Sequence, residues 1–260
     1  MEQLAGKVAV ISGASKGMGR HFTRALTGAG MQVAALARPS PQLDSMSAEF
    51  GPAVLPIACD VADPDQVNAA IAQAAARLGR IDVLVNNAAV FEPFAFDQGS
   101  DAVIRRHIDI NLTGLCWLTR AAIPQLKASQ GQVVNITSES VRMPFPMLAL
   151  YAATKAAVET LSEGLRAELR DDAVRISVLR SGSVSGGSGG EGWSDAAKAA
   201  FYQKIVQTGH AAMSGSPASP ESMAEALLAI LALPRDVSVD LVELRAAQAG
   251  VPEGARAIPQ

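Results

Sequence analysis

The chain has 260 residues, a formal net charge of −3 and 49% hydrophobic side chains. The small negative charge gives no indication of a nucleic-acid or anionic-membrane partner, and the hydrophobic content is enough for a large core. Cys59 and Cys116 lack metal-ligand spacing, so we interpret them as buried free thiols in a reducing compartment. The first residues do not resemble a signal peptide, and no apolar run approaches the roughly 18 residues of a membrane span. The expected location is cytoplasmic.

Short, nearly continuous apolar runs alternate with longer Ala- and Leu-rich segments. We predict seven strands, each buried on both faces, over residues 7–13, 32–38, 53–60, 82–88, 132–138, 174–182 and 239–245. Most segments between them have helical periodicity; in 150–170, for example, Val158, Leu161, Leu165 and Leu169 form one apolar stripe. This alternation predicts a parallel sheet with helices on both faces. No linker divides residues 1–260, so we predict a single α/β domain.

The stretch "SGSVSGGSGGEGW" (181–193) interrupts this alternation, because it is rich in glycine and has no apolar stripe. It follows the carboxyl end of a predicted strand, where open α/β sheets bind their ligands. We interpret it as the start of a flexible substrate lid over about 183–215. The alternative is a surface loop without a role in binding.

The first predicted strand leads into a glycine-rich turn, "ISGASKGMG", that opens a helix. Gly13 gives the backbone freedom for a tight turn, and the absence of side chains at Gly17 and Gly19 allows a pyrophosphate to approach the backbone. The free N–H groups of the following helix then face the phosphates. In this strand–turn–helix context the spacing predicts a Rossmann-like, doubly wound dinucleotide-binding fold.

The end of the second predicted strand indicates which dinucleotide binds. An acidic residue usually holds the ribose 2′-OH of NAD there, but this chain has Ala37 and Arg38. A guanidinium pairs with a 2′-phosphate through parallel hydrogen bonds, and Lys16 adds a second cation, so we predict NADP(H). Alternatively, Arg38 faces only solvent. Asp60 follows the third strand and is a candidate for the adenine amino group, although it could instead cap the helix near Pro64, a position that Asp63 fits better.

Tyr151 and Lys155 are one helical turn apart, so both lie on one face of the predicted helix. A nearby cation favours phenolate, and we therefore expect Lys155 to lower the pKa of Tyr151 from about 10. Ser138, at the end of the fifth strand, is placed to donate a hydrogen bond to a substrate carbonyl. Asn111 is unfavourable inside a helix and is interpreted either as a site residue or as an exposed helical amide.

These motifs, in this order, resemble those of the short-chain dehydrogenases/reductases, over roughly residues 5–190. "SGASKGMG" is similar to the family's T-G-x-x-x-G-x-G, "NNAA" (86–89) to N-N-A-G, and "YAATK" to Y-x-x-x-K. The resemblance implies a catalytic tetrad of Asn111, Ser138, Tyr151 and Lys155. Tyr151 would be the general acid in ketone reduction, Ser138 would orient the carbonyl, Lys155 would also hold the nicotinamide ribose, and Asn111 would keep a relay water through neighbouring backbone.

The chain departs from the family pattern at three places. Ala89 replaces a glycine, Ser181 and Ser185 replace the proline and threonine of the motif after the sixth strand, and the glycine-rich C-terminal motif is missing. We expect only modest adjustment around Ala89, and we expect the Ser185 hydroxyl to reach the cofactor carboxamide. The candidate cofactor contacts are Gly13, Ser15, Lys16, Gly17, Met18, Gly19, Arg38, Asp60, Val61, Asn87, Ala88, Ala89, Tyr151, Lys155, Gly182 and Val184.

The resulting hypothesis is an NADPH-dependent carbonyl reductase that transfers the pro-S hydride of the nicotinamide. Two alternatives are an NAD-dependent alcohol dehydrogenase and a catalytically silent dinucleotide-binding regulatory protein. The resemblance also implies a homotetramer or homodimer, built on helices near 98–128 and 150–170. The three histidines have no metal spacing, so no metal site is predicted. Candidate substrate-pocket residues, mostly apolar and thus suited to a hydrophobic or aromatic ketone, are Glu139, Val141, Phe145, Val184, Trp193 and Phe201.

Overall fold

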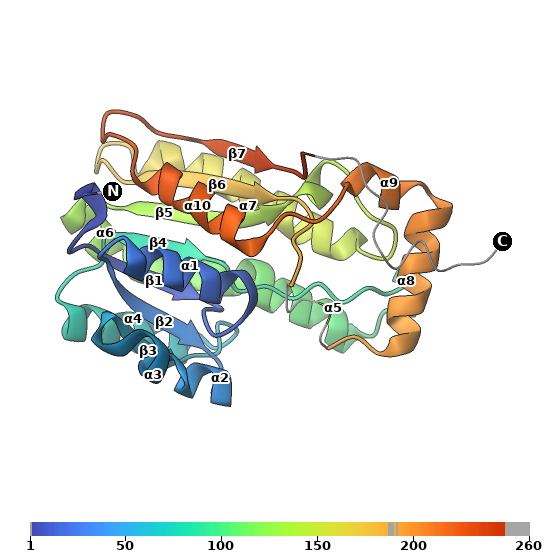
Figure 1. The fold of residues 1–260 in the computed structure, drawn as a ribbon, viewed down its shortest axis with the longest axis horizontal. Helices are drawn as coiled ribbons and strands as arrows, with labels where there is room; N and C mark the ends of the chain where they lie inside the picture. The colour runs from blue at the N-terminus through green and yellow to red at the C-terminus, as the bar shows by residue number, and fades with distance from the viewer. Residues whose placement is uncertain (1, 187–189, 191, 248–260) are drawn as a thin grey trace.

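A computed structural model of the chain describes residues 2–186, 190 and 192–247. Its centre is a seven-stranded sheet with the order β3-β2-β1-β4-β5-β6-β7, in which every neighbouring pair is parallel (Figure 1). All seven predicted strands are present, most of them shorter at their ends, but the expectation that each is buried on both faces is wrong for the edge strands β3 and β7, which have a neighbour on one side only. Their bounds are β1 (Val8–Ser12), β2 (Gln32–Ala37), β3 (Val54–Ala58), β4 (Val83–Asn86), β5 (Gln132–Ser138), β6 (Arg175–Ser181) and β7 (Leu241–Leu244).

Helices connect the strands and account for most of the remaining described residues. Their bounds are α1 (Gly17–Gly28), α2 (Pro41–Asp44), α3 (Met46–Phe50), α4 (Pro64–Leu78), α5 (Asp101–Ile108), α6 (Gly114–Ser129), α7 (Ala149–Glu168), α8 (Asp195–Gln207), α9 (His210–Ser214) and α10 (Pro220–Leu231). Single turns occupy η1 (Glu2–Leu4), η2 (Gly51–Ala53), η3 (Phe96–Gln98) and η5 (Glu139–Val141), and a π-helical turn, η4 (Asp109–Thr113), joins α5 to α6. The cap of α4 is Asp63, as predicted, because its carboxylate accepts hydrogen bonds from Asp65 N and Gln66 N.

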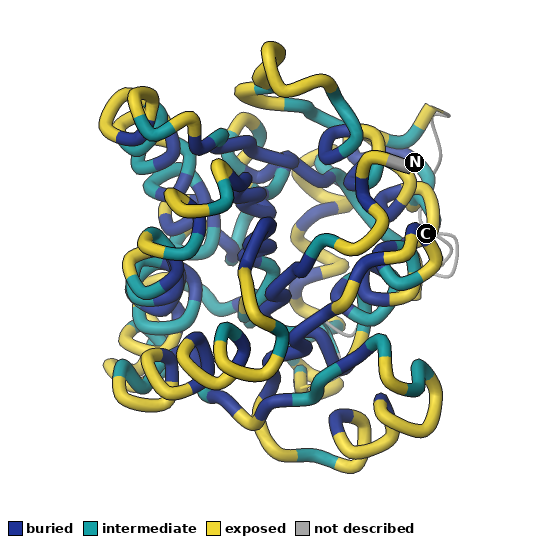
Figure 2. The backbone as a smooth tube through the Cα atoms, turned by 90° about the vertical axis from the view of Figure 1, so that its left-hand side faces the viewer, coloured by how far each residue is buried: buried dark blue, intermediate teal, exposed yellow. Residues whose placement is uncertain are grey.

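Two apolar cores cover the two faces of the sheet. Successive residues of β1 point to opposite faces, so Ala9 and Ile11 pack with α1 and α10, whereas Val10 packs with α4 and α6. Figure 2 shows the resulting layers, with buried backbone in the middle and exposed turns of helix outside. The doubly wound α/β fold predicted from the alternation of strands and helices is therefore confirmed.

The buried face of α7 differs from the predicted apolar stripe. Val158 is fully buried, but Leu161 and Leu165 are only half-buried, and the inner face instead carries Lys155 and Ser162. Placing a lysine and a serine toward a sheet is costly unless they find partners. The sequence of α7 is therefore adapted to a polar site rather than to packing alone.

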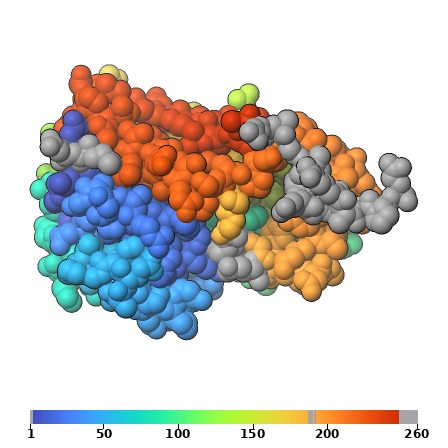
Figure 3. Space-filling model, in the orientation of Figure 1, coloured from blue at the N-terminus to red at the C-terminus, as the bar shows by residue number. Residues whose placement is uncertain are grey.

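The segment predicted as a lid contains two helices. In Figures 1 and 3, α8 and α9 lie beyond one end of the sheet, apart from the helices that cover its faces. Phe201, Ile205 and Ala211 of these helices form a small third core with Leu148. Residues 187–189 and 191 of the expected lid lie outside the described part of the chain, and its flexibility remains a prediction. Among the described helices, none is long and apolar enough to cross a membrane.

Candidate active site

A cleft of about 890 Å³ lies where β1, β4, β5 and β6 end. β1 and β4 are neighbours although β2 and β3 lie between them in sequence, so the cleft is at the topological switch point of the sheet. Most residues singled out in the sequence line this cleft: Gly13, Ser15, Lys16, Met18, Arg38, Asp60, Val61, Asn87, Ala88, Ala89, Ser138, Glu139, Phe145, Tyr151, Lys155, Gly182, Val184, Trp193 and Phe201. Gly17, Gly19, Asn111 and Val141 do not.

The glycine turn is closely packed, which explains two of its glycines. Gly13 has a positive φ of +65°, and a Cβ on Gly19 would lie 2.1 Å from Gly13 O and 2.8 Å from Asn87 Nδ2. α1 begins at Gly17 without a side-chain cap and without an acidic residue in its first turn. Its first N–H groups are thus available to an anion, and this arrangement fits the pyrophosphate of a dinucleotide.

Ser12 and Asn87 hold this turn against the end of β4. The Ser12 hydroxyl accepts hydrogen bonds from Asn87 N and Ala88 N, both at 3.1 Å. The Asn87 side chain donates to Ser12 O at 3.0 Å and to Gly13 O at 3.1 Å. The serine at position 12 therefore links the glycine turn to the "NNAA" segment, and both border the cleft.

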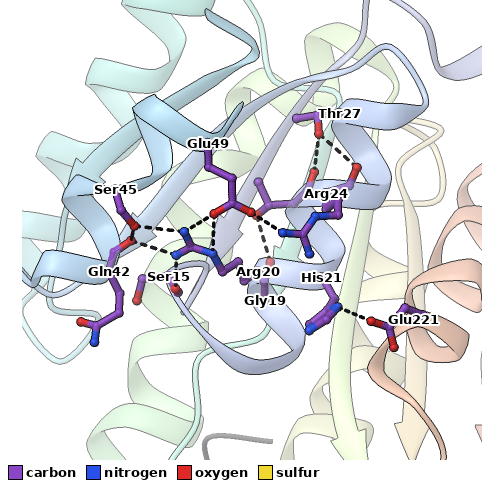
Figure 4. Close-up of polar contacts among 11 residues, drawn as sticks. Ser15, Gly19, Arg20, His21, Arg24, Thr27, Gln42, Ser45, Glu49 and Glu221 are labelled. Carbon is purple, nitrogen blue, oxygen red and sulfur yellow. Dashed lines mark hydrogen bonds and ion pairs between the residues drawn. The ribbon is translucent and has the colours of Figure 1, made fainter. Parts of the chain in front are cut away.

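Arg20 is a further residue of this region that the sequence analysis did not identify. Its guanidinium donates to Ser15 O at 2.8 Å and to Gln42 O at 3.0 Å. It also pairs with Glu49, which in turn pairs with Arg24 (Figure 4). Arg20 thereby connects the glycine turn with the segment after β2, which carries Arg38.

The predicted cations lie at the cofactor end of the cleft. Lys16 and Arg38 are both exposed, and both line the cleft together with Ser40 and Gln42. Arg38 therefore borders the cleft as well as facing solvent. Asp60 also lines it, and its carboxylate accepts a hydrogen bond from Ala62 N at 3.0 Å. The capping role considered for Asp60 belongs to Asp63.

Asn111 is buried rather than exposed, so the exposed-amide interpretation is wrong. Its Oδ1 accepts from Val90 N and its Nδ2 donates to Val90 O, both at 2.8 Å, and Nδ2 also donates to Thr154 Oγ1 at 3.2 Å. The π-helical turn η4 carries Asn111, and such turns occur often at functional sites. Asn111 does not line the cleft but fixes the backbone that does, at Val90.

Tyr151, the predicted proton donor, lies beside Ser138 and next to the buried Lys155. Lys155 is 3% exposed, its Nζ donates to Ile136 O at 2.9 Å, and it lies 5.8 Å from the centre of the Tyr151 ring. Burial raises the pKa of Tyr151 to about 12, and the hydrogen bond with Ser138 acts in the opposite direction. Burial also lowers the pKa of Lys155 to about 8.

The expectation that the pKa of Tyr151 lies below 10 is therefore wrong, because burial raises it to about 12. Desolvation is the dominant effect on Tyr151, although the Lys155 ammonium group, which donates to a backbone carbonyl of β5, lies over the phenol ring. At neutral pH the phenol is protonated, which is the state that an acid requires. The lysine, whose pKa is about 8, is mostly charged at that pH.

Aromatic side chains form one wall of the cleft next to Tyr151. The Phe91 ring is 5.5 Å from the Tyr151 ring and 5.1 Å from Trp193, which is 5.4 Å from Phe201. Sequence periodicity did not reveal Phe91, because it lies in an irregular segment after β4. Tyr202 also borders the cleft but is 42% exposed.

Two expectations about individual residues, one for the substrate and one for the cofactor, need correction. Val141 is half-buried in η5 and does not reach the cleft, because the turn after β5 directs Glu139 and Ser140 there instead. The Ser185 hydroxyl donates to Ala218 O at 3.2 Å and lies outside the cleft. Its backbone N–H bonds the same carbonyl, next to the bridge between Val184 and Ala218, so the segment after β6 is tied to the residues before α10.

Comparison with known proteins identifies the family to which the chain belongs. Residues 7–195 match the family model for short chain dehydrogenases, and the chain belongs to this family of nicotinamide-dinucleotide-binding oxidoreductases. It is 35% identical over 189 residues to an 11-beta-hydroxysteroid dehydrogenase-like protein of Arabidopsis thaliana, covering 71% of this chain but only 61% of that relative. It is 31% identical over 250 residues to the farnesol dehydrogenase of Aedes aegypti, covering 92% and 95% of the two chains.

Among solved structures, the alcohol dehydrogenase from the archaeon Thermococcus sibiricus, complexed with 5-hydroxy-NADP, is similar with a TM-score of 0.79 and 28% identity. The similarity covers 93% of this chain and 97% of that one. The likeness thus extends beyond the matched family segment of residues 7–195.

We expect Gly19→Ala to abolish most dinucleotide binding, because its methyl group would collide with Gly13 O and force the glycine turn apart. Gly28→Ala is the matched control in the same helix, since a Cβ there meets nothing within 4 Å. Calorimetric titration with the dinucleotide, together with the melting temperature of each variant, checks this. Unchanged affinity of a folded Gly19→Ala variant would contradict the assignment of the turn.

Proposed function

We propose that the protein reversibly reduces a ketone to a secondary alcohol with NADPH. The observation that carries the proposal is the Ser138–Tyr151 hydroxyl pair above buried Lys155, at the edge of a cleft that fits a dinucleotide. The bound cofactor supplies a hydride to the carbonyl carbon. Tyr151 donates its proton to the carbonyl oxygen, which Ser138 holds by a hydrogen bond.

Lys155 acts when the proton leaves Tyr151. A phenolate then develops in a buried environment that raises its free energy, and the ammonium group close to the ring offsets that cost. Asn111 contributes indirectly by holding the Val90 backbone in place. In alcohol oxidation the same groups act in reverse, with Tyr151 as the base.

The preference for NADP(H) is supported by Lys16 and Arg38, which border the same part of the cleft. Among the described residues, Asp60 is the acidic side chain at this end of the cleft, and it follows β3 rather than β2. The structural relative from Thermococcus sibiricus was solved with an NADP derivative. A homodimer or homotetramer remains part of the proposal on the basis of the family resemblance, and a cytoplasmic location remains a prediction.

Tyr151→Phe should lower ketone reduction roughly 10²- to 10⁴-fold, the usual contribution of a positioned general acid, and leave NADPH affinity unchanged. Tyr202→Phe is a matched control, because the chain has only two tyrosines and Tyr202 is exposed. Steady-state kinetics and NADPH titration of both variants check this. Normal turnover by Tyr151→Phe would exclude Tyr151 as the proton donor.

Arg38→Asp should raise the KM for NADPH. It should also reduce the preference for NADPH over NADH, measured as the ratio of their kcat/KM values, by the equivalent of roughly 1–3 kcal/mol, the value of a charge-assisted hydrogen bond. Arg77→Asp makes the same charge change in the last turn of α4, away from the cleft. The ratio of kcat/KM for the two cofactors is the measurement. An unaltered ratio in Arg38→Asp would show that Arg38 does not contact the 2′-phosphate.

The kcat/KM for NADPH in ketone reduction should be constant near neutral pH and fall as pH rises through about 8. Tyr151 stays protonated over this range, whereas Lys155 loses the charge that stabilises the phenolate. Lys155→Arg keeps a positive charge at this position. In the activity that remains, the decrease of kcat/KM with rising pH should therefore occur at a higher pH than in the wild-type protein. A profile that rises through pH 8 would contradict the role given to Lys155.

A further inference from the structure

The cleft is also lined by a buried carboxylate in the turn after β5. Glu139 directly follows Ser138, is 4% exposed and lines the cleft. Its Oε1 accepts a hydrogen bond from Ser214 Oγ of α9 at 2.6 Å, and its Oε2 lies 3.3 Å from Arg245 Nε. Each carboxylate oxygen has two acceptor positions, so these contacts leave capacity for a ligand.

The charge that faces the cleft here is negative. Arg245 does not line the cleft: its side chain is 44% exposed, and its Nη2 donates to Met213 O at 2.8 Å. Among the described residues of the lid, Lys198 of α8 is a cation that borders the cleft; its side chain is 41% exposed and its Nζ lies 3.6 Å from Asp195 Oδ1. A pocket for purely apolar ketones would need no buried carboxylate beside its catalytic serine.

Ser140 gives a second, independent indication of a polar ligand. It is 1% exposed and lines the same cleft, yet its Oγ has no hydrogen-bond partner among the described residues. An unpaired buried hydroxyl costs free energy. Glu139 and Ser140 together therefore offer a strong acceptor and an unused hydroxyl donor, side by side in the chain and close to Ser138.

We propose that Glu139 and Ser140 form a subsite for a hydroxyl group, and that the substrate is a hydroxy ketone with an apolar or aromatic group on its other side. This inference rests on the proposed function, because it places the carbonyl at Ser138 and Tyr151. A substrate hydroxyl satisfies both residues, since it donates to the Glu139 carboxylate and accepts from the Ser140 hydroxyl. An ammonium group has no lone pair to accept from Ser140. The aromatic wall of Phe91, Trp193 and Phe201 receives the other substituent.

The test compares phenacyl alcohol with propiophenone, which has a methyl group in place of the hydroxyl, using NADPH and purified full-length protein. We expect kcat/KM to favour phenacyl alcohol by roughly 10- to 100-fold, as for a hydrogen bond to a charged group. Glu139→Leu should remove this preference mainly by slowing phenacyl alcohol. Ser140→Ala, a small change that removes an unpaired hydroxyl, should reduce the preference severalfold without loss of NADPH binding.

Arg245→Gln is the matched control, because it breaks the ion pair with Glu139 from outside the cleft and should keep the preference for phenacyl alcohol. A preference that disappears equally in Arg245→Gln and Glu139→Leu would mean that Glu139 only supports the fold, and would overturn the proposal. Phenacylamine distinguishes the charged alternative: if it is preferred over phenacyl alcohol and Glu139→Gln abolishes that preference, the subsite binds ammonium and the hydroxyl assignment is wrong.

The same assay distinguishes failure of the hydroxyl subsite from failure of the proposed ketone reduction. Reduction of both ketones at similar kcat/KM by the wild-type protein overturns the hydroxyl subsite but supports ketone reduction. Binding of NADPH without reduction of any of the three ketones counts against the proposed function, and the subsite then falls with it.

Discussion

The parallel register of β1, β4, β5 and β6 is the constraint on which the site depends. Because these strands run in the same direction, Ser12, Asn86, Ser138 and Ser181 end them at one edge of the sheet. Each loop that follows must therefore begin at the same cleft. The contacts of Ser12 with Asn87 N and Ala88 N show how closely the first two of these loops are joined.

Buried polar side chains then give the cleft its fixed geometry. Asn111 holds Val90 by two hydrogen bonds, Lys155 is held by Ile136 O, and Asn135 joins Asn86 to Ser162 beneath the site. Such groups are costly to bury without partners, and a network that satisfies them favours one arrangement over others. Among the described residues, the Ser140 hydroxyl is buried without a partner, as are Asn86 Oδ1 and Gln132 Oε1, but Ser140 is the one of these three residues that lines the cleft.

The sequence predicted those features that depend on local pattern. Continuous apolar runs identified all seven strands, and the position of Ser138 at the end of the fifth strand was enough to place it at the edge of the sheet where the cleft lies. The sequence missed features that depend on contacts between distant segments. Arg20 bonds Gln42, Glu139 bonds Ser214 and Arg245, and Phe91 packs on Tyr151 and Trp193. The pKa of Tyr151 was misjudged for a related reason, since desolvation depends on the whole surrounding fold and not on the spacing to Lys155.

The most direct test of the account is the fate of a deuterium label at the pro-S position of the nicotinamide C4 of NADPH. When the protein reduces a ketone with this cofactor, we predict that mass spectrometry and NMR will locate the deuterium on the carbinol carbon of the alcohol. The hydroxyl hydrogen should come from solvent, as expected for proton transfer through Tyr151. Product alcohol without deuterium, or deuterium retained in NADP⁺, would contradict the proposed hydride transfer in this cleft.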